Sequence, residues 1–217
     1  MSGKQTRAAQ EPGRDCPLCP RLVDFRQGNR EAHGDWHNGP VPAFGPLTAK
    51  LLIVGLAPGL RGANRTGRPF TGDFAGQLLY PTLLKIGLAH GTYGERPDDG
   101  LALVDARISN AVRCVPPQNK PDTVEIKTCN DFLSKEIAAM KNLKAILALG
   151  GIAHNAVLAA LEQKRGSFPF AHAATHKLSN GLLLTDSYHC SRLNTNTGRL
   201  TTKMFEDVVK GLKAQVG

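Results

Sequence analysis

The sequence predicts an α/β protein in which a central, mainly parallel four-stranded sheet lies between two layers of helices. Four short apolar runs lack the apolar–polar alternation of a half-exposed strand, as is typical of strands that are buried on both faces. Helical patterns lie between and after these runs. Strands that alternate with helices form right-handed crossovers, so the expected architecture is a three-layer α/β/α sandwich.

The elements follow one another in an order that suits this sandwich. The predicted strands are Leu51–Gly55, Arg107–Val112, Lys144–Leu149 and Leu182–Asp186. The predicted helices are Phe74–Gly87, a segment that starts near Asp122, Ile152–Leu161 and Thr202–Leu212. Asp122 is a plausible N-cap because Glu125 follows three residues later. The last helix repeats apolar side chains on one face, namely Met204, Phe205, Val208, Val209 and Leu212.

The length of 217 residues suits one domain with a core large enough to need no disulfides. We expect that domain to span residues 16–217, after a polar, disordered lead-in at 1–15. The lead-in lacks the apolar stretch of a secretory signal, and no apolar run is long enough to span a membrane. We therefore expect a monomeric, cytoplasmic protein in a reducing compartment, where structural disulfides are rare.

The charge of the chain points to a polyanionic partner. Lysine and arginine number 27 against 18 aspartates and glutamates, which gives a formal net charge of +9. A basic surface binds nucleic acid because neutralising its phosphates releases condensed counterions. A soluble basic protein without such a partner is the alternative.

Five cysteines require an explanation in a chain of this kind. Cys16 and Cys19 form a CxxC pair, whose turn lets both thiolates face one point. A thioredoxin-like redox pair should follow a strand and open a long helix, whereas this pair borders the polar lead-in. Cys114 and Cys129 could complete a tetrahedral metal or cluster site, while Cys190 stands apart. Scattered buried thiols are the alternative.

Three unusual loops follow predicted strands. The first strand is followed by GLAPG (Gly55–Gly59) and by a segment that ends at Asp73, the second by Cys114–Pro121, and the fourth by Ser187–Asn196. Ligands of α/β folds bind in the crevice beyond the carboxyl ends of the strands, so these loops predict a binding site. The first loop matches no phosphate-binding pattern, and a tight strand-to-helix turn is its alternative interpretation.

Residues in these loops have side chains that suit a nucleic-acid ligand. Phe70 can stack on a flat base, an interaction worth roughly 1–3 kcal/mol. Asp73 offers a carboxylate, although it could instead cap the helix that follows. His189 lies at the end of a strand, where a purely structural role is the alternative. Polar and basic side chains suit phosphate contacts, although 191–199 could also be a solvated loop; they are Arg65, Arg68, Ser191, Arg192, Asn194, Asn196 and Arg199.

Several motifs follow one another between Cys16 and Thr201, in this order: CPLCPRL, PVPAFG, GLAPG, NRTGRPFTGD, AVRCVPPQNKP and YHCSR with NTNTGRLT. With them the sequence resembles the family-5 (B-type) uracil-DNA glycosylases of bacteria and archaea. The resemblance implies the uracil-DNA glycosylase fold, and DNA containing uracil or other deaminated bases as the partner. It also implies a [4Fe–4S] cluster held by Cys16, Cys19, Cys114 and Cys129, with zinc as the alternative occupant.

The resemblance implies roles for single residues too. Asp73 assists the attack of water or stabilises the sugar cation, Asn119 is a polar partner in the pocket, and His189 stabilises the departing base or grips the DNA. The implied substrate-binding residues are Gly55, Ala57, Pro58, Gly59, Phe70, Phe44 and Asn110.

One position departs from many uracil glycosylases, which carry Asp, Asn or Glu where this chain has Leu56 and Ala57. The departure assigns water activation to Asp73 and indicates looser base discrimination, so hypoxanthine, xanthine and 5-substituted uracils are expected substrates as well. Base flipping favours such lesions, since a mismatched base is less costly to extrude. No lysine lies in the motifs as a Schiff-base nucleophile, Lys120 being the nearest, so a monofunctional enzyme is expected. A non-catalytic, zinc-containing nucleic-acid-binding protein is the alternative function.

Overall fold

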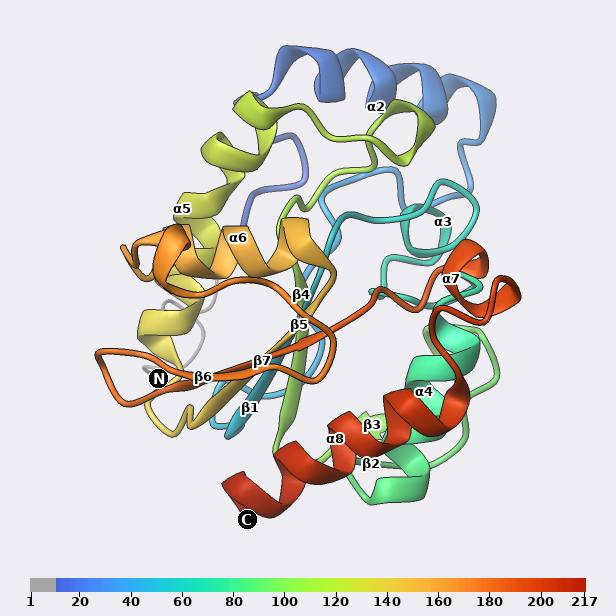
Figure 1. The fold of residues 1–217 in the computed structure, drawn as a ribbon. Coiled ribbons are helices and arrows are strands. Elements are labelled where there is room, and N and C mark those ends of the chain that lie inside the picture. The colour runs from blue at the N-terminus through green and yellow to red at the C-terminus, as the bar shows by residue number, and fades with distance from the viewer. Residues whose placement is uncertain (1–10) are drawn as a thin grey trace, which may run out of the picture.

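The computed structural model describes residues 11–217, which form a central sheet between two layers of helices (Figure 1). The sheet is five-stranded, in the order β4-β1-β5-β7-β6. Its strands are β4 (Ala106–Asn110), β1 (Leu51–Gly55), β5 (Ala145–Leu149), β7 (Leu183–Ser187) and β6 (Thr175–Lys177). The first four are parallel and β6 is antiparallel to β7. The predicted fold class is therefore confirmed, with one strand more than expected.

The additional strand β6 is a short edge strand. Its three residues are exposed or half-buried, and they pair with Leu183–Thr185. The strand pairs with β7 along one edge only and its side chains are at most half-buried. Its sequence, Thr-His-Lys, therefore needs no apolar run. The four predicted strands all exist, and their observed ends differ from the predicted ones by two residues at most. A separate two-stranded hairpin consists of β2 (Ala89–His90) and β3 (Ala102–Leu103).

Two helical layers cover the two faces of the sheet. One layer contains α4 (Gly76–Ile86) and α8 (Thr202–Val216), and the other contains α5 (Thr123–Ala139) and α6 (Gly151–Ala160). Successive side chains of the apolar run in β1 enter the two cores alternately, which is why that run shows no apolar–polar alternation. These four helices are the predicted ones. The expected cap of α5 is present, since the Glu125 carboxylate accepts a hydrogen bond of 2.7 Å from the Asp122 N–H.

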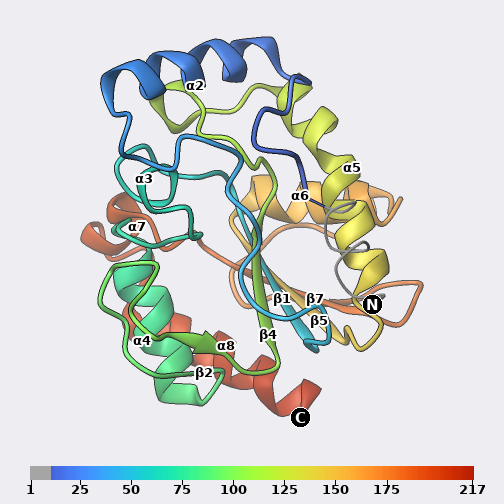
Figure 2. The same cartoon turned by 180° about the vertical axis from the view of Figure 1, so that it is seen from behind.

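Three helices were not predicted: α2 (Pro20–Ala32), α3 (Ala63–Thr66) and α7 (Arg192–Asn196). Helix α2 buries only Leu22, Arg26 and Asn29, a narrow stripe in which two of the three side chains are polar. An apolar periodicity is therefore missing from its sequence. Figure 2 shows α2 beside the loop that follows β4 and the start of α5. The Arg21 guanidinium joins these segments by an ion pair of 2.7 Å with Glu125. Two short 3₁₀ turns occupy Pro117–Asn119 and Arg165–Ser167.

Of the expected disordered lead-in at 1–15, residues 1–10 lie outside the described residues. Residues 11–15 belong to the folded domain, contrary to expectation. The Glu11 carboxylate forms ion pairs of 3.1 and 2.8 Å with the buried guanidinium groups of Arg107 and Arg113. These two arginines also bind Glu136 of α5, at 2.6 Å each. A buried guanidinium requires anionic partners, so Glu11 is fixed by charge rather than by apolar packing.

The topology determines where a ligand can bind. From β1 the chain proceeds first to β4 on one side and then to β5 on the other. The loops that follow these strands therefore diverge at the carboxyl edge, which is where open α/β sheets form a crevice. No helix among residues 11–217 has the length and apolar character needed to cross a membrane.

Candidate active site and cysteine centre

A cavity of about 420 Å³ lies at the carboxyl ends of β1, β4 and β7. Its size is within the range of small-molecule sites. The three predicted catalytic residues, Asp73, Asn119 and His189, all line it. Its full lining is Leu56, Ala57, Gly59, Phe70, Asp73, Phe74, Ala75, Asn110, Asn119, His189, Ser191 and Arg192. The loops that the sequence predicted to converge do so at this cavity.

Backbone closely surrounds the Asp73 carboxylate. The Ala63 N–H donates a hydrogen bond of 3.0 Å to Oδ2. A Cβ atom at Gly59 or Gly62 would overlap the carboxylate, so only glycine permits this approach. Burial raises the pKa of Asp73, while the N–H groups of Ala63 and Gly59 and the charge of Arg65 oppose that rise. Asp73 does not cap the following helix, because α4 begins after Ala75.

The Asn110 amide lies at the floor of the cavity, where β4 ends. Its Oδ1 atom is buried and has no hydrogen-bond partner among residues 11–217. A Cβ at Gly55 would overlap both this atom and the Phe70 ring, so the glycine at the end of β1 makes room for both side chains. Phe70 has a left-handed backbone with φ of 57°, which directs its buried ring toward this floor. A buried acceptor without a partner is costly unless a ligand supplies a donor.

His189 lies on the other side of the cavity, just beyond the end of β7. Its ring centroid is 6.2 Å from that of Phe70, with 30° between the ring planes. Burial lowers the pKa of His189 to about 4, so the imidazole is neutral at physiological pH. The Asn194 side chain donates a 2.9 Å hydrogen bond to the His189 carbonyl, and Ser191 caps α7 by accepting from the Asn194 N–H. Asn194 therefore fixes the backbone at His189 rather than lining the cavity.

Asn119 is exposed at the mouth of the cavity, in the 3₁₀ turn that follows β4. Gln118 and Asn119 both have left-handed backbones, with φ of 55° and 57°. Asparagine tolerates this conformation better than most residues, whereas for Gln118 it is strained, and such strain is concentrated at functional sites. The turn lies between Pro116 and Pro121, which limit the other conformations of the loop.

Of the other residues predicted to bind DNA, Arg65, Asn196 and Arg199 are exposed but do not line the cavity. The Arg199 guanidinium lies 4.4 Å from the centroid of the Tyr188 ring. Arg192 does line the cavity and lies 5.0 Å from the centroid of the Phe74 ring.

Arg68 and Phe44 are elsewhere than expected. Arg68 is 5% exposed, and its guanidinium donates bonds of 2.8 and 2.7 Å to both carboxylate oxygens of Asp99. It also lies 5.2 Å from the centroid of the Phe44 ring, which packs against the core. A guanidinium enclosed in this way cannot reach a phosphate, so the predicted DNA contact of Arg68 is wrong. Phe44 stabilises this buried ion pair and does not line the cavity. Gly55 and Pro58 are buried and likewise do not line it.

Sequence reasoning missed Leu193, which follows Arg192 in α7. Its side chain is 71% exposed, although it is apolar. Ser191 and Arg192, which precede it, both line the cavity. Exposed leucines are common on protein surfaces, so the exposure of Leu193 is informative only because α7 lies next to the cavity.

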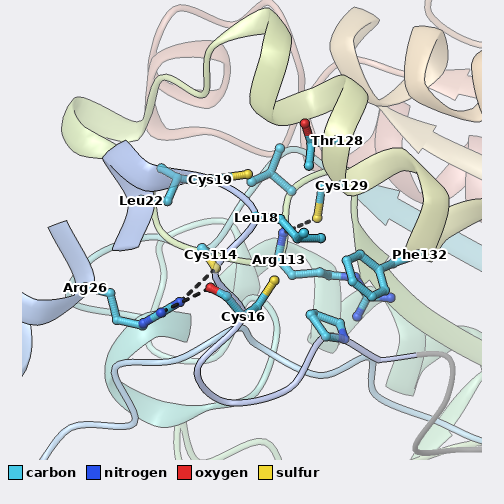
Figure 3. A pocket seen from close by; sticks show the side chains of 12 residues that line it. Cys16, Leu18, Cys19, Leu22, Arg26, Arg113, Cys114, Thr128, Cys129 and Phe132 are labelled. Atoms are coloured by element: carbon cyan, nitrogen blue, oxygen red, sulfur yellow. Dashed lines mark hydrogen bonds between the residues drawn. The ribbon is translucent and has the colours of Figure 1, made fainter. Parts of the chain in front are cut away.

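The four predicted ligand cysteines meet in a second pocket (Figure 3). Cys16 and Cys19 precede α2, Cys114 follows β4, and Cys129 lies in α5. Leu18, Leu22, Val112 and Phe132 give the wall apolar side chains, and the remaining lining residues are Pro12, Arg26, Arg113 and Thr128. Cys190 is fully buried in the core that α4 and α8 cover, apart from this group.

The thiols of this second pocket influence one another's protonation. Burial, with a contribution from neighbouring thiols, raises the pKa of Cys19 to about 11 and that of Cys114 to about 12. Burial also raises the pKa of Cys129. All five cysteines of the chain are free thiols. No three of these cysteines have sulfur atoms within 4.8 Å of one another, so the set fits an iron–sulfur cluster, which spans more than one ion and whose cations would hold the thiols deprotonated.

Comparison with known proteins relates most of this chain to one superfamily. The family model of the uracil DNA glycosylase superfamily matches residues 42–213. A Type-5 uracil-DNA glycosylase of Thermus thermophilus is 43% identical over 93% of this chain and 94% of its own length. A Type-5 uracil-DNA glycosylase of Pyrobaculum aerophilum is 37% identical over 94% of this chain and 90% of its own. A Type-4 uracil-DNA glycosylase of the same organism is 32% identical over 67% of this chain.

Proposed function

The chain belongs to the uracil DNA glycosylase superfamily, and from this membership we propose that it is a DNA repair enzyme that removes uracil from DNA. The reaction is hydrolysis of the N-glycosidic bond. Water adds its oxygen to C1′ of the sugar, the electron pair of the broken bond leaves with the base, and an abasic site remains. One observation carries this proposal: a single cavity combines a carboxylate, a neutral imidazole and a buried amide oxygen without a partner.

Asn110 is the residue that we propose recognises uracil. Uracil carries an N–H between two carbonyl groups, and the buried Oδ1 atom of Asn110 lacks such a donor. A base that supplies the donor satisfies the amide, whereas a base that presents an acceptor there leaves two buried acceptors facing each other. The Phe70 ring next to Asn110 offers an apolar face on which the base can stack.

Asp73 and His189 act at the two ends of the bond that breaks. Positive charge develops on the sugar in an oxocarbenium-like transition state, and the ionised Asp73 stabilises it and orients the attacking water. Negative charge develops on the base, and the neutral imidazole of His189 carries one N–H that can donate to a carbonyl oxygen of the base. Because His189 is uncharged, it does not weaken the attraction between Asp73 and the sugar.

The proposed substrate range extends to hypoxanthine and xanthine. Leu56 and Ala57 line the cavity with apolar groups that make few specific hydrogen bonds to a base, and the volume of about 420 Å³ leaves room for a purine. The enzyme is proposed to be monofunctional, because no lysine lines the cavity in the described part of the chain.

The surface around the cavity is proposed to bind DNA. Arg192 lies at its rim, and the chain carries an excess of positive charge for phosphate contacts. The exposed Leu193 suits a wedge that enters the base stack where the damaged nucleotide has left it, as apolar side chains of DNA-bending proteins do.

The proposed cofactor is a [4Fe–4S] cluster held by Cys16, Cys19, Cys114 and Cys129. The convergence of four thiols from three segments and their apolar wall support this proposal. At this position a cluster cross-links α2, the loop after β4 and helix α5. Its role is then structural, since the cysteine pocket and the catalytic cavity have different lining residues.

The proposal is tested by single-turnover excision from oligonucleotides that carry uracil, hypoxanthine or xanthine, with alkali cleavage at the abasic sites. We expect Asp73→Asn to reduce excision of every base at least about 100-fold, as other electrostatic groups do. Asn110→Leu should reduce excision of all three bases, because each carries, next to a carbonyl group, an N–H from which Oδ1 of Asn110 can accept a hydrogen bond. Asp131→Asn and Asn155→Leu, which alter side chains outside the cavity, are the matched controls and should leave all rates unchanged. Wild-type protein that binds such DNA but releases no base would refute the proposal.

A further inference from the structure

Arg26 of α2 differs from the other buried arginines in its partners. The buried arginines of the described chain are Arg26, Arg68, Arg107 and Arg113. The last three each form an ion pair with at least one carboxylate. Arg26 is 3% exposed, yet none of the ion pairs among residues 11–217 includes it. A buried cation without an anion is strongly unfavourable, so the environment of Arg26 must supply negative charge in some other way.

The partners that Arg26 does have belong to the cysteine pocket (Figure 3). Its Nη1 atom lies 3.9 Å from Sγ of Cys114, and its Nη2 atom donates a 3.2 Å hydrogen bond to the Cys16 carbonyl. Its Nε atom is buried and has no partner within residues 11–217. Arg26 also lines the pocket itself, beside the four thiols. The guanidinium therefore faces the place where the four sulfur atoms converge.

The nearby acid does not account for this arrangement. A hydrogen bond from Arg30 lowers the pKa of Asp15, and the charge of Arg26 contributes to this. However, the Asp15 side chain is 72% exposed and pairs with Arg30 at 2.7 Å. Protonated thiols would supply no anion either. The thiols become anions when they bind a cation, and four thiolates carry more negative charge than a divalent centre neutralises. The surplus negative charge is the counter-charge that Arg26 otherwise lacks.

We propose that Arg26 is a positioning residue of the cysteine centre, which donates to the Cys114 thiolate, anchors the Cys16 segment and offsets the negative charge of the four thiolates. This inference rests on the proposed cysteine-bound cofactor. The backbone N–H of Arg113, which donates to Sγ of Cys129 at 3.4 Å, provides a second hydrogen bond to the same centre. Donors to ligand sulfur atoms retain the metal and raise the reduction potential of an iron–sulfur centre, because they stabilise added negative charge.

The test compares Arg26→Met with wild-type protein that carries its native metal, in two measurements. The first is the rate at which a chelator removes the metal, which we expect to increase about 10- to 100-fold, as is typical when an outer-shell partner of a metal site is lost. The second is the reduction potential of the centre at an electrode, which should become more negative because a nearby positive charge is gone. Gln27→Met is the matched control, since Gln27 is the next residue of α2 and is exposed. Both quantities should keep their wild-type values in this control.

Arg26→Lys separates charge from geometry, because it retains the positive charge but not the planar fork of donors. We expect it to restore most of the reduction potential but only part of the metal retention, whereas a merely structural role would predict no recovery of the potential. If Arg26→Met does not fold, the test is the comparison of Arg26→Lys with wild type. An unchanged rate of metal loss in Arg26→Lys would then overturn the proposal. Wild-type rates and potential in a folded Arg26→Met would overturn it as well.

The possible results distinguish the role proposed for Arg26 from the proposal that the four cysteines bind a cluster. Wild-type protein that holds no metal would refute the cysteine centre and the role of Arg26 with it. Zinc in place of iron would refute the cluster alone, because the rate of metal loss still tests Arg26. A bound cluster that is indifferent to Arg26→Met would refute only the role of Arg26.

Discussion

Replacement of Gly59 by alanine tests whether the position of the Asp73 carboxylate controls the reaction. A Cβ atom at residue 59 would overlap Oδ1 of Asp73 and would lie 3.0 Å from its Cγ. No positive φ is required at Gly59, so alanine can adopt the backbone and the clash with the carboxylate is the only strain. The carboxylate borders the cavity and has room to move into it. The substitution should therefore displace Asp73 and little else.

The displacement predicts a large loss of rate without a comparable loss of stability. Restoring ordinary van der Waals contact requires Oδ1 of Asp73 to move from 2.1 Å to at least 3.4 Å from the new Cβ atom, which is a shift of more than 1 Å. A misplacement of that size costs about 100-fold in rate, which corresponds to about 2.7 kcal/mol of activation free energy. Single-turnover excision of uracil measures the rate, and thermal unfolding measures the stability, which should stay close to the wild-type value.

A matched glycine provides the control for this experiment. Gly166 has open space around its Cβ position, so Gly166→Ala should leave the excision rate unchanged. A crystal structure of Gly59→Ala should show a rotated or shifted Asp73. If Gly59→Ala excises uracil within twofold of the wild-type rate, the reasoning that ties catalysis to the position of Asp73 is refuted.

Three further predictions concern charge. Because burial raises the pKa of Asp73 and the ionised form is the active one, the excision rate should fall with decreasing pH already above the ordinary aspartate pKa of about 3.9. Protonation of His189, at a pKa of about 4, should add to the fall, and a pH profile without the early fall would contradict the assignment. Arg68→Met should destabilise the protein by about 3–5 kcal/mol in urea unfolding, because the enclosed Asp99 carboxylate loses its only cationic partner among residues 11–217 and keeps only the N–H groups of Gly94 and Leu101. The exposed Arg65→Met should have little effect, and equal stabilities would show that the ion pair is unimportant. Arg192→Ala should weaken binding of uracil-containing DNA and reduce the slope of log K against log salt by about 0.9, and an unchanged slope would mean that this rim does not contact phosphates.

The sheet and the convergence of the loops could be predicted because the information is local. Each run of apolar residues specifies a strand that is buried on both faces, and parallel strands place their carboxyl ends at one edge. Asp73, Asn119 and His189 come from three distant segments, yet this rule brings them to one cavity. Strand β6 could not be predicted in the same way, because its Thr-His-Lys sequence is defined only by pairing with β7.

The partners of buried charges could not be predicted from the sequence. Arg65 and Arg68 stand three residues apart in one motif and are chemically identical, but only Arg68 lies opposite Asp99 in the folded chain. Glu11 likewise has no local feature that distinguishes it from its neighbours. Its fixed position depends on two arginines that are about a hundred residues away in the chain.

The sequence by itself determined the fold class, the cysteine set and the loops from which the cavity is built, because periodicity, glycine placement and motif spacing are properties of neighbouring residues. Only the tertiary structure decided that Asn110 keeps a free buried acceptor and that Arg26 faces four thiols without a carboxylate. The physical reason is that burial and pairing are long-range properties: the free energy of a charge or an amide depends on which groups the rest of the chain brings against it.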